Sequence, residues 1–131
     1  MGGRNKAART LVAIGSIVLF ASAALHTAAG YLKGLPALTA SNLSAPVQAA
    51  FRTVFLLAGW DWMVIAIVAL VAAFTETKLR KALVLFCGAT LVVETGLMLA
   101  LMGLFLGNGM IGSAAVLILC GGMLFHDGVS G

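Results

Sequence analysis

Three ionisable side chains, His26, Asp61 and Glu94, each lie inside a different apolar stretch of the sequence. Such groups are costly in a bilayer, so they usually face a bundle interior, pair with one another or line a wet cavity. A histidine and two carboxyl groups can exchange protons, and they can bind a cation or a polar solute. We therefore take His26, Asp61 and Glu94 as the core of a candidate ligand or proton site.

The amino-acid composition indicates which kind of secondary structure positions these residues. Of the 131 residues, 62% are hydrophobic and only 9% are charged, whereas soluble domains are near half apolar and a quarter charged. A chain of this kind has too few polar side chains to cover a surface in water. The sequence predicts an all-α integral membrane protein, because helices satisfy their own backbone hydrogen bonds in lipid. Its length fits a single membrane domain over residues 1–131.

The order of the apolar stretches predicts a four-transmembrane-helix bundle, with helices at about 11–32, 46–74, 79–106 and 109–126. Each of the first three contains enough apolar residues to cross a hydrocarbon core of ~30 Å. The fourth apolar run has marginal length, about 24 Å at the helical rise, so it is expected to be a short span or a re-entrant piece.

The connections carry helix-stop and helix-start signals. Pro36 is expected to break the first long connection, and Ser44 followed by Pro46 predicts the start of the second helix. The stretch 107–109, Gly-Asn-Gly, predicts the turn between the last two helices. Residues 107–112 match the dinucleotide-binding pattern G-x-G-x-x-G, but the preceding strand that this pattern requires is missing, so we expect no nucleotide binding.

Small residues mark two helix faces. On the first helix, His26 shares a stripe with Gly15, Ser22 and Gly30, which is typical of a helix-packing face. On the third helix, Gly103 is expected to form a small-residue pair with Gly107, nearly opposite Glu94. Glu94 would then face one neighbouring helix while the glycine pair approaches another.

The basic residues indicate how the chain is threaded. Six of the eight precede the first helix or lie between the second and third: Arg4, Lys6, Arg9, Lys78, Arg80 and Lys81. The positive-inside rule then predicts that both termini are cytoplasmic, and the Ala- and Gly-rich spans favour a bacterial inner (plasma) membrane. Lys33 and Arg52 lie on the other side, where we expect them to act as interface anchors. This distribution does not form a nucleic-acid-binding face.

The rotation of residues around the helix reduces the number of possible partners for Asp61. Arg52 precedes Asp61 by nine residues, which is about 180° of rotation, so a regular helix separates the two side chains. The partner must come from another helix, and His26, Lys33 and Glu94 are the candidates. Counted from the expected outer ends, His26, Asp61 and Glu94 lie about 9, 12 and 18 Å deep, within a turn or two of one level.

The tryptophans flanking Asp61 and the two cysteines leave alternatives open. Trp60 and Trp62 either line a cavity around the site or mark the membrane interface, where tryptophan is enriched. Cys87 and Cys120 are expected to be packing residues, since no Cys-x-x-Cys motif accompanies them.

Three functions agree with these features. The first is binding or transport of a small solute or ion, coupled to protonation of Asp61 or Glu94. The second is a non-enzymatic accessory subunit of a larger membrane complex, in which protonated carboxyl groups only join helices. The third is a membrane enzyme with a metal on the histidine and the two carboxylates, although no H-E-x-x-H spacing supports it. The sequence leaves both the metal and any cofactor unknown. Besides the lipid bilayer, the expected partners are further copies of the chain or other membrane subunits, and not nucleic acid.

Overall fold

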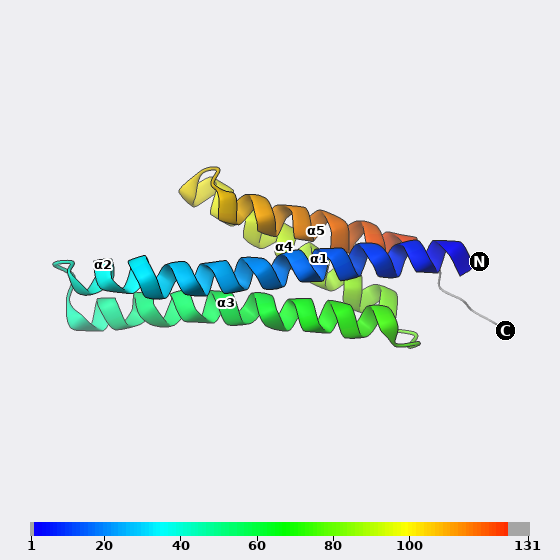
Figure 1. The fold of residues 1–131 in the computed structure, drawn as a ribbon, viewed down its shortest axis with the longest axis horizontal. Coiled ribbons are helices and arrows are strands. Elements are labelled where there is room, and N and C mark those ends of the chain that lie inside the picture. The colour runs from blue at the N-terminus through cyan, green and yellow to red at the C-terminus, as the bar shows by residue number, and fades with distance from the viewer. Residues whose placement is uncertain (1, 126–131) are drawn as a thin grey trace.

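The computed structural model describes residues 2–125, so His126, at the end of the fourth expected helix, lies outside them. The described chain is helical throughout, apart from short connections (Figure 1). Its elements are α1 (Gly2–Ala29), a π-helical turn η1 (Gly30–Gly34), α2 (Leu35–Thr39), α3 (Ala45–Phe74), α4 (Arg80–Met102) and α5 (Leu106–Leu124).

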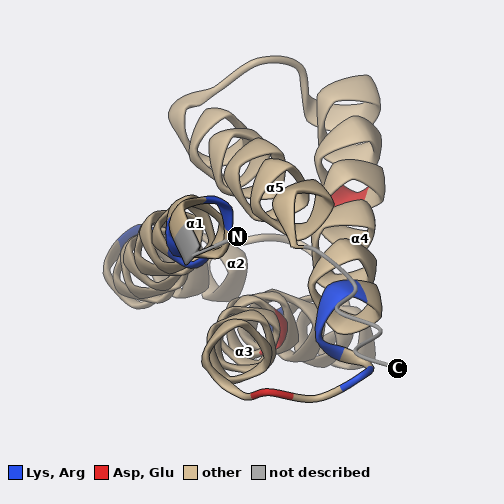
Figure 2. Ribbon diagram, turned by 90° about the vertical axis from the view of Figure 1, so that its right-hand side faces the viewer, with Lys and Arg blue, Asp and Glu red and all other residues tan. Residues whose placement is uncertain are grey.

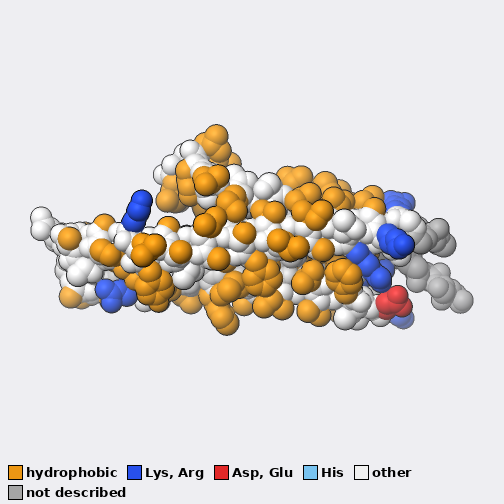
Figure 3. Space-filling model, viewed as in Figure 1, with side chains coloured by type: hydrophobic (Ala, Val, Ile, Leu, Met, Phe, Trp, Pro, Cys, Tyr) orange, Lys and Arg blue, Asp and Glu red, His pale blue; other side chains and the backbone are white. Residues whose placement is uncertain are grey.

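Four helical stretches are long and apolar enough to cross a membrane: Gly3–Thr39, Ala45–Phe74, Arg80–Met102 and Leu106–Leu124. This confirms the prediction of an all-α chain with four candidate membrane helices. Hydrophobic side chains cover the middle of the face in Figure 3, and Lys and Arg side chains lie toward the two ends. A bilayer can therefore surround the middle of the molecule, while its ends meet water and lipid headgroups.

The first helix is much longer than the predicted 11–32. Helical structure starts at Gly2 and continues through η1 and α2 to Thr39, so Pro36 does not end the helix. A proline inside an α-helix clashes with the carbonyl group four residues earlier. Here the wider π turn directly precedes it, with the Leu35 N–H bonded to the Gly30 carbonyl oxygen, and Pro36 falls in the first turn of α2, where a missing N–H is tolerated.

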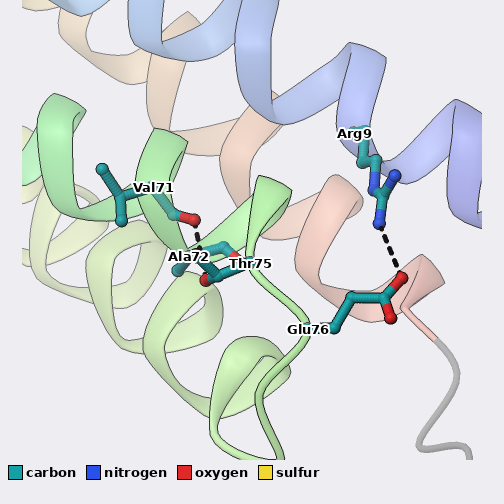
Figure 4. Close-up of polar contacts among 5 residues, drawn as sticks. All are labelled: Arg9, Val71, Ala72, Thr75 and Glu76. Carbon is teal, nitrogen blue, oxygen red and sulfur yellow. Dashed lines mark hydrogen bonds and ion pairs between the residues drawn. The ribbon is translucent and has the colours of Figure 1, made fainter.

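The start of α3 agrees with the predicted signals. Ser44 is its N-cap and Pro46 lies in its first turn. At the other end, the Thr75 hydroxyl group donates to the carbonyl oxygens of Val71, at 2.9 Å, and Ala72, at 3.4 Å (Figure 4). The Val71 oxygen also accepts the Thr75 backbone N–H at 3.0 Å, and Thr75 itself has extended backbone angles, so the helix ends at Phe74.

The predicted turn at 107–109 is wrong. The chain turns at 103–105, and Gly-Asn-Gly forms part of the first turns of α5. Gly103 ends α4 with φ 73°, a backbone conformation that side chains disfavour. The buried Asn108 side chain closes the turn: it accepts from the Phe105 N–H at 3.0 Å and donates to the Gly103 carbonyl oxygen.

Two earlier expectations change with this turn. The third helix ends at Met102 and not at 106, so Gly103 and Gly107 do not form a pair on one helix. The fourth helix gains residues at its start, and its 19 residues correspond to about 28 Å, close to a full span.

The helices form two hairpins, one of α1, α2 and α3 and the other of α4 and α5 (Figure 1). The α1 helix packs extensively against both α3 and α5, and α4 packs against α5, whereas α3 and α4 have the least contact of these neighbours. We call the end formed by residues 2–9 and 75–81 the basic end, and the end formed by residues 39–45 and 103–106 the opposite end.

Candidate functional site

His26 on α1 is held by Phe55 on α3. His26 Nε2 lies 3.0 Å from the Phe55 carbonyl oxygen, and the two rings are stacked with centroids 3.9 Å apart and planes 16° from parallel. A carbonyl oxygen only accepts hydrogen bonds, so Nε2 must carry the hydrogen. In the neutral ring the other nitrogen, Nδ1, is then an acceptor, and it has no hydrogen-bond partner among residues 2–125.

The stacking depends on Gly30, one helical turn after His26. A Cβ atom at Gly30 would lie 2.0 Å from Cε1 of the Phe55 ring. The missing side chain therefore makes the space into which this ring inserts. Phe55 was not predicted from the sequence, because a phenylalanine in an apolar helix carries no signal that distinguishes it from its neighbours.

Trp62 connects the His26–Phe55 pair to α4. Its side chain is 6% exposed, and its ring lies edge-on to the His26 ring, with centroids 4.9 Å apart. The indole Nε1 donates a hydrogen bond of 3.0 Å to Glu94 Oε2 on α4. One buried ring thus touches α1 on one side and binds the carboxyl group of α4 on the other.

Asp61 lies beside Glu94, and the two carboxyl groups interact through their side chains. Of the three candidate partners of Asp61, the structure therefore pairs it with Glu94. No ion pair joins Asp61 to Arg52 or Lys33 among the described residues. Unlike Trp62, Asp61 is exposed on the surface of the single chain.

The depths of the two carboxyl-bearing residues agree. Asp61 precedes the end of α3 by 13 residues, and Glu94 follows the start of α4 by 14 residues. At the helical rise, both lie about 20 Å from the basic end of their helices. Beyond the pair, α3 extends from Asp61 back to Ala45 and α4 continues from Glu94 to Met102, so the pair lies near the middle of the helices and not at either end.

The remaining predicted site residues lie apart from this group. Trp60 is 63% exposed and has no contact with the site among the described interactions, so the two tryptophans have different environments. Lys33 and Arg52 are exposed, which agrees with anchors at the interface.

His26 does not join the two carboxyl groups in a three-ligand cluster among residues 2–125. Within the described part of the chain, no three His, Cys, Asp or Glu side chains form a group suitable for a metal ion. His26 bonds to a backbone carbonyl group and does not join the carboxyl pair. Of the two cysteines, Cys87 is buried and Cys120 is exposed, and both are free thiols.

Comparisons of the chain with protein-family models, with curated proteins and with solved structures found no match. The functional argument therefore depends on the geometry of this site alone.

Proposed function

We propose that the protein is a small multi-pass membrane protein that binds or transports a small cation, inorganic or organic, in exchange for a proton at Asp61 and Glu94. The proposal rests on the side-chain interaction of Asp61 with Glu94, on two helices that are each long and apolar enough to span a membrane. Two carboxyl groups in contact can share one proton, and a cation can take the place of that proton.

The surroundings of Glu94 support a change of charge. The Trp62 N–H is a fixed donor to one oxygen of Glu94, and a donor of this kind stabilises a carboxylate. Asp61 is exposed on the surface of the single chain, so the pair is not enclosed within one copy and a second copy could complete the site. His26 contributes an acceptor nitrogen one ring away, in contact with Trp62.

The sign of the pH dependence follows from competition between the cation and the proton. Raising the pH removes the proton from the pair, so the affinity for a cation should increase with pH. Isothermal titration of Na⁺, K⁺ and tetramethylammonium into the purified protein, from pH 5 to pH 9, measures this directly. Proton release in weakly buffered solution is the independent readout.

Neutral amides test the two carboxyl groups separately. Asp61→Asn and Glu94→Gln keep hydrogen-bonding capacity, so the helices should still assemble, but the pH-dependent binding should disappear. Glu76→Gln is the matched control, because Glu76 is also a carboxylate but its side chain is 87% exposed at the basic end. If both amide variants keep the pH dependence of the original protein, the proton-exchange proposal is wrong.

The proposed orientation places both termini in the cytoplasm of a bacterial cell, with the basic end facing inward. The distribution of lysine and arginine supports it. Reporter fusions that are active only in the cytoplasm or only outside it, made at each terminus, test this orientation.

A second candidate function is that of a subunit in a larger membrane assembly. Exposed Asp61 favours it, because a carboxyl group facing lipid is costly and another chain could cover it. Purification in a mild detergent distinguishes the two proposed functions. A partner protein in stoichiometric amount supports the role of a subunit, and a defined homo-oligomer without other proteins supports cation binding.

A further inference from the structure

The basic end gathers most of the positive charge of the chain. Six of the eight Lys and Arg residues lie there, in the first turns of α1 and around the α3–α4 connection. Figure 2, which looks onto this end, shows the ribbon coloured blue at Lys and Arg positions around the helix ends and red at an acidic position in the α3–α4 connection. The charges directly adjoin the apolar parts of the helices, at the level where lipid headgroups surround a membrane protein.

Arg9 is incompletely paired. One guanidinium nitrogen lies 3.6 Å from Glu76 Oε1 (Figure 4), longer than a normal charge-assisted hydrogen bond. Its Nε is buried and has no hydrogen-bond partner among the described residues. The Arg9 side chain is 33% exposed, so its outer N–H groups, unlike the buried Nε, can donate to an acceptor outside the described chain.

Aromatic rings hold two of the arginines at the boundary of the apolar region. The Arg9 guanidinium lies over the Phe74 ring, 5.9 Å from its centroid, and that of Arg80 lies over the Phe125 ring at 4.5 Å. Phe74 is 56% exposed, so in a bilayer its ring would meet acyl chains while the guanidinium stands above it. A guanidinium in this position can offer paired N–H donors to a phosphate group.

Three more cations complete this surface. Arg4, Lys6 and Lys78 are exposed and have no ion-pair partner in the described residues. They lie one to two helical turns beyond the apolar stretches, so their long side chains can reach headgroup phosphates without leaving the helix ends.

We propose that the basic end binds the phosphate headgroups of anionic phospholipids, with Arg9 as the ordered hydrogen-bonding contact and Arg4, Lys6 and Lys78 as the electrostatic surface. Lipid fits better than a soluble acidic partner, because the cations are arranged around the helix ends beside exposed apolar side chains. Anionic lipid surfaces attract basic residues at this position, by an amount equivalent to roughly fivefold in affinity for each residue.

The test uses the full chain, purified in a mild detergent. Phosphatidylglycerol and phosphatidylcholine with the same acyl chains are titrated in turn, and bound lipid is counted by native mass spectrometry. We expect phosphatidylglycerol to bind more tightly and its binding to weaken as salt is raised. The triple variant Arg4→Gln/Lys6→Gln/Lys78→Gln should lose more than tenfold in affinity, and Arg9→Gln should lose the tightest-bound lipid.

The opposite end provides the matched control. Lys33→Gln/Arg52→Gln also removes exposed cations, and it should lower phosphatidylglycerol affinity much less than the triple variant does. Equal affinity for phosphatidylglycerol and phosphatidylcholine would overturn the proposal. A loss of phosphatidylglycerol affinity in the control variant as large as that in the triple variant would also overturn it. If soluble poly-glutamate displaces phosphatidylglycerol at matched charge concentration, the surface is instead a docking site for an acidic protein. The exposed residues of the triple variant carry no packing role, so this result does not depend on whether Arg9→Gln folds.

Discussion

The Trp62 indole N–H donates a hydrogen bond of 3.0 Å to Glu94 Oε2, between α3 and α4, which pack less extensively than α1 and α3, α1 and α5, or α4 and α5. The same ring lies edge-on to His26, so Trp62 touches a polar side chain of α1 and one of α4. The candidate site is therefore organised around an aromatic residue, and the carboxyl pair lies at its margin.

Replacing Trp62 with phenylalanine tests this bond. The ring contact with His26 is kept and the donor to Glu94 is lost, so the protein should lose roughly 1 kcal/mol of stability. Thermal unfolding in detergent measures the change. Trp60→Phe is the control: Trp60 is 63% exposed, and its replacement should leave the unfolding temperature unchanged. A Trp62→Phe protein as stable as the original would show that the bond contributes nothing.

Gly30→Ala should disturb the His26 side of the site. The new Cβ would lie 2.0 Å from the Phe55 ring, and the ring would have to leave its stack on His26. Overpacking of this kind costs about 1–3 kcal/mol. Gly34→Ala, in the same π-helical turn, meets no atom within 4 Å, so it should have little effect on the unfolding temperature.

A second substitution separates steric strain from a backbone effect at Gly30. Adding Phe55→Leu to Gly30→Ala shortens the side chain that the new methyl group meets, and it should recover part of the lost stability. No recovery in the double variant would mean that the alanine acts through the π-helical backbone and not through the Phe55 ring.

Gly103→Ala should weaken the α4–α5 turn. Gly103 has φ 73° and ψ −172°, a region that is essentially restricted to glycine, so the substitution should cost about 1–3 kcal/mol. Gly109→Ala is the control, because Gly109 lies within α5 with no atom near its missing Cβ. Alanine there should be neutral or should stabilise by up to ~1 kcal/mol. Equal unfolding temperatures for the two variants would contradict the turn geometry.

Part of the candidate site could be predicted from the sequence. Helical phase alone separates Asp61 from Arg52, and counting residues places Asp61 and Glu94 at similar depths, because both arguments need only a regular helix. The choice among His26, Lys33 and Glu94 as the partner of Asp61 could not be made. Phase shows the direction in which a side chain points on its own helix, but it does not show which neighbour lies there.

The sequence by itself determined the class of protein, since long apolar stretches with few charges allow only helices in lipid. It also determined where α3 begins, because Ser44 and Pro46 act through local backbone geometry. Only the tertiary structure decided that α1 continues past Pro36 and that the last turn forms at Gly103. The same holds for the bond between Trp62 and Glu94. These outcomes depend on contacts between helices, and helices that are apolar on every side carry little sequence signal for which faces will meet.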